Sequence, residues 1–177
     1  MSMNKPRRLL RAALALLACA SGPAMAAIVT MAGSAGTVDD NDEGIYYTSG
    51  SSVGVLTAAP NPSTVNVYYN VPQLSGFAGA RALRWTVRYR EDIGARVALT
   101  LRRYDLATGT STTVDTFDSD DYSDTNGVPR TDQRCETVVN WDFDLATYFV
   151  EAALTRPDDD SLSILYGFGL ESLAACP

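Results

Sequence analysis

Apolar and polar side chains alternate along most of the chain after residue 44, which is the pattern of β-strands with one buried face. No stretch beyond residue 27 shows sustained helical spacing. Because each strand has a single apolar face, the strands must cover one another. We therefore predict an all-β fold of about eight strands in two antiparallel sheets, a β-sandwich. The expected strands span residues 45–48, 52–57, 64–71, 81–90, 96–104, 111–117, 135–140, 148–155 and 162–170.

The alternation is clearest in residues 81–90, where arginines and a threonine separate the apolar positions. Trp85 and Tyr89 are expected to point into the core, while Arg84 and Arg88 face solvent. Residues 96–104 carry a matching apolar row. We therefore predict that the two stretches pair as a hairpin, with both apolar rows on one side.

A second pairing is expected near the C-terminus, between residues 148–155 and 162–170, which a turn rich in aspartate connects. Strand parity places Tyr148 and Tyr166 in the core, as large aromatic side chains in alternating positions usually are. The same parity leaves Tyr104 exposed at the end of its strand.

The chain from residue 71 to 104 has a lead-in of Leu74, Ser75 and Gly76, then an aromatic strand and a hairpin with a variable turn. A tyrosine-rich ending follows at residues 148–170. Together these features resemble jelly-roll β-sandwich modules of bacterial secreted or phage-tail-like proteins. The resemblance implies a jelly-roll-like fold and no catalytic residues, because that class of module shares none.

The start of the chain has the three parts of a secretory signal peptide: basic residues, an apolar stretch at 12–20, and small residues at Ala24 and Ala26. We predict a signal peptide at 1–26, a loose N-terminal segment at 27–44 and a β-sandwich domain at 45–177. The apolar stretch is too short to span a membrane, and export to the periplasm or the extracellular space is expected. An alternative is a lipoprotein signal, in which Cys19 would carry a lipid anchor.

Composition narrows the function classes. The chain has 14 Lys and Arg against 21 Asp and Glu, a net charge of −7, which disfavours nucleic acid as a partner. It has no histidine, which excludes Ser-His-Asp and Cys-His catalysis and imidazole ligation of metals. Outside the leader the cysteines are Cys135 and Cys176. In an oxidising compartment we expect them to form a disulfide bond.

Arginines gather on the predicted strands 81–90 and 96–104. In the expected hairpin they share one outer face, where guanidinium groups can bind carboxylate or phosphate bidentately. The candidate ligand-binding residues for an anionic glycan or a protein partner are Arg84, Arg88, Arg90, Arg96, Arg102 and Tyr104. The alternative is a row of solvated surface charges.

Acidic residues gather in the loop after residue 117. Calcium takes six to eight oxygen ligands, and clustered carboxylates in a turn supply several. A structural calcium is therefore a candidate cofactor, with solubilising turns as the alternative. The candidate ligands are Asp118, Asp120, Asp121 and Asp124.

Glycoside hydrolysis is the enzyme class that needs only two carboxylates, about 5–10 Å apart. Glu151 and Glu171 fall about 20 Å apart in the expected strands, and no catalytic group is identified. We therefore predict an exported, non-catalytic binding module that recognises an envelope glycan or a protein partner. The alternatives are a structural or self-assembling surface subunit and, third, a glycoside-active enzyme.

Overall fold

The computed structural model describes residues 26–123 and 126–177. These residues form eleven strands, all paired antiparallel, in a six-stranded and a five-stranded sheet that pack face to face. The predicted all-β sandwich is confirmed, with more strands than expected. The leader and Cys19 lie outside the described residues, so export remains a prediction.

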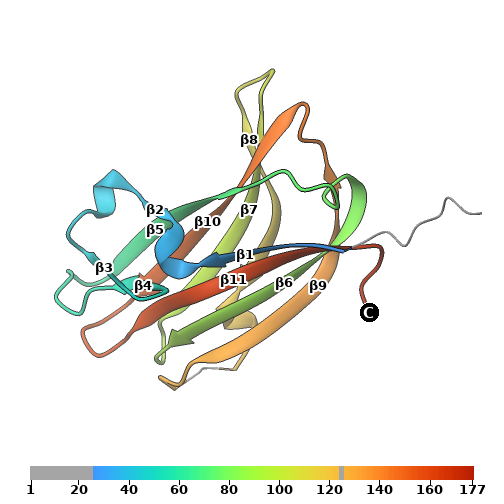
Figure 1. Ribbon diagram of the computed structural model, residues 1–177. Coiled ribbons are helices and arrows are strands. Elements are labelled where there is room, and N and C mark those ends of the chain that lie inside the picture. The colour runs from blue at the N-terminus through green and yellow to red at the C-terminus, as the bar shows by residue number, and fades with distance from the viewer. Residues whose placement is uncertain (1–25, 124–125) are drawn as a thin grey trace, which may run out of the picture.

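The six-stranded sheet forms the front layer in Figure 1. Its strands pair in the order β3-β4-β11-β6-β9, and β1 pairs with β11 beside β4. The bounds are β1 Ala27–Ala32, β3 Tyr46–Ser49, β4 Ser52–Val55, β6 Gly79–Glu91, β9 Arg130–Trp141 and β11 Ser163–Leu173.

The five-stranded sheet lies behind it, in the order β2-β5-β10-β7-β8. Three short 3-10 turns, η1 Gly33–Ala35, η2 Asp40–Asp42 and η3 Ser119–Asp121, occupy connections. The strand bounds are β2 Thr37–Val38, β5 Ser63–Val71, β7 Arg96–Asp105, β8 Ser111–Asp118 and β10 Ala146–Arg156.

The core lies between the two sheets and follows the predicted parity of β6. Trp85 and Tyr89 are fully buried, whereas Arg88 between them is exposed. The indole Nε1 of Trp85 donates a hydrogen bond to Asp115 of β8, 2.9 Å away across the sandwich. Because the indole N–H is satisfied inside the protein, this large ring is buried without an unpaired donor.

The two long hairpins that we predicted are wrong. β6 pairs with β9 and β11, whereas β7 pairs with β8 and β10, so β6 and β7 lie in opposite sheets. β10 and β11 are divided in the same way. An apolar row can meet its partner row either beside it in one sheet or across the core, and the short connections span the roughly 10 Å between sheets.

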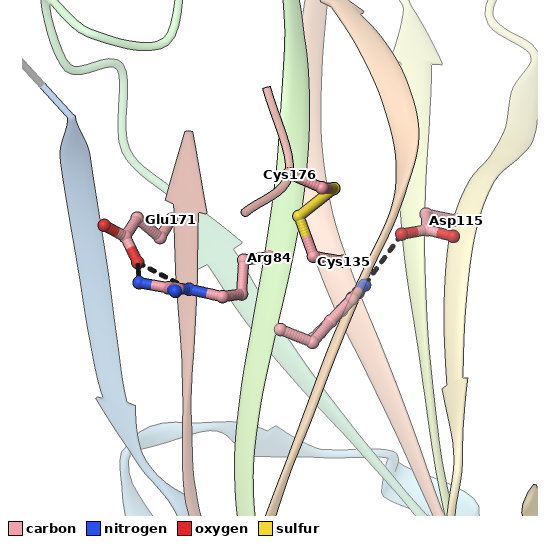
Figure 2. The surroundings of a disulfide bond; sticks show 6 residues. Arg84, Asp115, Cys135, Glu171 and Cys176 are labelled. Atoms are coloured by element: carbon pink, nitrogen blue, oxygen red, sulfur yellow. Dashed lines mark hydrogen bonds and ion pairs between the residues drawn. A yellow bond between two sulfur atoms is a disulfide. The ribbon is translucent and has the colours of Figure 1, made fainter. Parts of the chain in front are cut away.

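Residues 27–44, expected to be loose, are ordered by pairing: β1 lies along β11 and β2 lies along β5. The predicted disulfide is confirmed between Cys135 in β9 and Cys176 beyond the end of β11, with Cα atoms 5.7 Å apart. Figure 2 shows this bridge beside Arg84 and Glu171. Within the described residues, no helix is both long and apolar enough to cross a membrane.

Candidate functional site

A groove of about 470 Å³ lies on the outer face of the six-stranded sheet. Gly167 and Gly169 of β11 form its floor, while Thr30 of β1 and Thr86 of β6 stand on either side. Tyr166, Arg88, Thr131 and Ser51 add polar and aromatic groups to its lining. We call it the β11 groove. Its volume falls within the range of small-molecule sites, about 300–1,000 Å³.

Tyr166 reaches this groove because β11 contains a bulge between Leu165 and Gly167. The extra residue shifts the parity of the strand, so Leu165 and Phe168 both face the core. Tyr166 therefore lies half-buried on the outer face, and its predicted place in the core is wrong. The signal in the sequence was the pair of glycines that follows, since glycine inside a strand marks a bulge or a close backbone approach.

The two floor glycines differ in how much room they have. A Cβ at position 167 would lie 2.5 Å from the carbonyl oxygen of Met31 in β1, so only glycine permits the strands to approach there. A Cβ at position 169 would meet only ordinary contacts, the nearest at 3.7 Å, and would point between Thr30 and Thr86. The open floor at Gly169 therefore results from the choice of residue and not from backbone strain.

Arg88 borders the groove in a supported position. Its Nη1 donates to the Thr131 hydroxyl at 3.2 Å, and its guanidinium carbon lies 5.9 Å from the centre of the Tyr166 ring. That distance is close to the ~6 Å limit for a cation–π contact. Two neighbours therefore hold this side chain at the groove, and these contacts give its other nitrogens no hydrogen-bond partner.

Arg90 and Tyr47 extend the same face past the end of the groove. Tyr47 of β3 lies opposite Gly54, and Gly54 and Arg90 both lie opposite Ile164 of β11. Burial raises the pKa of Tyr47, the nearby Tyr166 raises it further, and the charge of Arg90 opposes the rise. The Nε of Arg90 is buried and has no hydrogen-bond partner among the described residues.

The single arginine face expected from the sequence does not exist, because β6 and β7 belong to different sheets. Arg84, Arg88 and Arg90 are on the outer face of the six-stranded sheet. Arg96, Arg102 and Tyr104 belong to β7 of the other sheet.

Three of these arginines form ion pairs with acids within the chain. Arg84 pairs with Glu171 on the neighbouring strand, as Figure 2 shows. Arg102 Nε lies 2.6 Å from Glu151 Oε2. Arg96 binds the carboxylate of Asp118. A cation that already has an internal partner is a poor candidate for binding an external anion.

The acidic loop, a candidate calcium site, is occupied by a cation of the chain itself. Asp118 accepts hydrogen bonds from Arg96, which lower the pKa of Asp118, and Asp120 Oδ2 lies 3.4 Å from Arg96 Nε. Asp121 is exposed, and Asp124 lies outside the described residues. Over residues 26–123 and 126–177, no group of three or more His, Cys, Asp or Glu is placed to hold a metal.

Two buried polar side chains were missed by the sequence reasoning. Arg156, expected in a turn, is fully buried at the end of β10 and donates to the carbonyl oxygens of Thr57 and Ala59 at 2.9 and 2.6 Å. Asp115 of β8 is also buried, and it accepts the hydrogen bond from Trp85. Both side chains hold the sandwich together, and neither faces the β11 groove.

Comparison with known proteins supports the fold. No family profile matches the sequence, and no curated protein matches it in sequence. Among solved structures, the chain is similar to the Glycosylation Associate Protein (Gap123) complex from Streptococcus agalactiae, with a TM-score of 0.51 and 12% identity. The match covers 84% of this chain and 26% of that one.

Two carbohydrate-binding modules are also similar. One is the CBM36-1 domain of a multidomain xylanase from the hindgut metagenome of Trinervitermes trinervoides, with 12% identity and a TM-score of 0.45, covering 81% of this chain and 96% of the domain. The other is a CBM36 module in complex with calcium and xylotriose, with 13% identity and a TM-score of 0.44, covering 81% and 99%. The predicted fold class rests on the two packed antiparallel sheets themselves, and fold alone does not establish function.

Proposed function

We propose that this protein is a non-catalytic module that binds a glycan in the β11 groove. The observation that carries the proposal is the lining: a half-buried tyrosine, an exposed arginine and three threonine hydroxyls surround a floor of two glycines. An aromatic ring packs against the apolar face of a sugar, while guanidinium and hydroxyl groups hydrogen-bond its oxygens. The glycine floor lets the ligand approach the backbone.

The same lining favours binding over hydrolysis. A glycosidase needs two carboxylates beside the scissile bond, and the described residues that line the groove include no acid. Glu151 and Glu171 pair with arginines on opposite sheets, so they do not form a catalytic pair. The division of the arginines between two faces also removes the basis for a subunit that assembles through one basic face.

We also propose that the protein works outside the cytoplasm. The support is the disulfide between Cys135 and Cys176, since such bonds persist in oxidising compartments. Alkylation of the protein recovered from each cell fraction tests this proposal. Free thiols on the functional pool would contradict it.

Binding to an array of immobilised polysaccharides tests the glycan proposal. Tyr166→Ala should weaken binding by about 10-fold, because it removes the stacking surface. Gly169→Val should abolish binding by filling the floor, at a position where a Cβ is tolerated. Tyr104→Ala, the same substitution at an exposed tyrosine of the other sheet, is the control and should bind as wild type. Binding that survives both groove variants would refute the proposal.

A further inference from the structure

We infer that the β11 groove selects an acidic glycan, whose carboxylate or sulfate ester binds Arg88 beside the Tyr166 ring. The inference rests on the proposed function and adds the class of sugar. Four observations carry it: the missing ion pair of Arg88, the absence of acids in the lining, the orientation of the guanidinium and the second positive charge of Arg90.

The pattern of ion pairs sets the groove apart. Seven of the ten arginines among the described residues form an ion pair with an Asp or Glu. Within that part of the chain, the three without such a pair are Arg81, Arg88 and Arg90, of which the last two border the groove face. In a chain where acids outnumber basic residues, arginines without an acidic partner are the exception. Arg88, which is exposed and lines the groove, is available to an anion from outside.

The surroundings of Arg88 do not repel an anion. The other residues that line the groove are uncharged, and the described lining holds no carboxylate. Glu171, farther along β11, is neutralised by Arg84. At physiological ionic strength charges are screened beyond about 8 Å, so the acidic loops elsewhere on the protein act weakly here. The local charge of the groove is therefore positive although the net charge of the chain is negative.

The guanidinium is already oriented to bind two oxygens of an anion. Thr131 holds one nitrogen, and the Tyr166 ring lies beside the group, so the side chain has less rotational freedom to lose on binding. The remaining donors form the fork that matches the two oxygens of a carboxylate or sulfate. Arg90, with its buried Nε lacking a hydrogen-bond partner in the described residues, adds a second charge on the same face.

Paired glycans test the inference. Each acidic polysaccharide on the array, such as polygalacturonate or a sulfated galactan, is spotted beside its neutral form, made by methyl esterification or desulfation. Wild-type protein should bind at least one acidic form about 10-fold or more tightly than its neutral partner. The uronate and sulfate arms show which of the two anionic groups is recognised.

Arg88→Gln should reduce this ratio to about 1, because the amide keeps a polar side chain on the strand and loses the charge. Arg81→Gln is the matched control. It removes the same charge from the same strand without breaking an ion pair, roughly 23 Å away along β6. The control should keep the wild-type ratio.

The failures of the two proposals are distinguishable. Equal binding of acidic and neutral forms, with sensitivity to Tyr166→Ala, would overturn the acidic preference and leave a glycan-binding module. A ratio lost equally in Arg81→Gln would also overturn it, because net charge and not the groove would then decide. Binding to no glycan on the array would overturn the proposed function itself.

Discussion

Replacement of both cysteines of the disulfide with alanine should destabilise the protein by about 4 kcal/mol. Cys135 and Cys176 are separated by 41 residues, and the bridge closes this loop in the unfolded chain. The chain-entropy relation for a loop of this length gives about 13 cal/mol/K, or about 4 kcal/mol at 25 °C. For a domain of this size the melting temperature should fall by roughly 8–16 °C.

The bridge also has a defined place in the fold. It ties the edge strand β9 to the chain beyond β11, with β6 between them. All three strands belong to the sheet that carries the β11 groove. Loss of the bridge should therefore affect the outer strand of that sheet first, while the fold persists in the absence of denaturant.

Urea unfolding followed by tryptophan fluorescence measures the effect, because both Trp85 and Trp141 are buried and their emission shifts on exposure. Wild-type protein treated with a reductant is the control and should match the double variant. A loss below about 1 kcal/mol, or no response to reductant, would refute the entropic reasoning for this bridge.

Three further predictions concern stability. Arg156→Met should cost about 3 kcal/mol or more in urea unfolding, because it leaves buried carbonyl oxygens unpaired; a loss under 1 kcal/mol would contradict this role. The hydrogen bond from Arg96 lowers the pKa of Asp118. The contribution of this bond to the free energy of unfolding is therefore present at neutral pH and lost as pH falls below about 4. Asp118→Asn should flatten the fall of the free energy of unfolding at acid pH, and an unchanged pH dependence would contradict this role of Asp118. Gly167→Ala should lower the melting temperature clearly more than Gly169→Ala; equal effects would show that β1 does not approach as closely as described.

Much of the architecture could be predicted from local pattern. The two-residue alternation in β6 correctly assigned Trp85 and Tyr89 to the core and Arg88 to solvent. The strands from β3 to β11 lie close to the predicted ranges, and the disulfide followed from the two cysteines outside the predicted leader. The strand positions and their buried faces depend on side-chain chemistry along one strand, which the order of residues records directly.

The pairing of strands and the location of the groove depended on the tertiary structure. Alternation shows which face of a strand is apolar. It does not show whether the matching apolar row lies on a neighbouring strand of the same sheet or on the opposite sheet across the core. We therefore predicted that β6 and β7 pair side by side, whereas they lie in opposite sheets. This arrangement divides the arginines between two surfaces. The bulge before Gly167 moved Tyr166 from the core to the outer face, because one extra residue reverses strand parity.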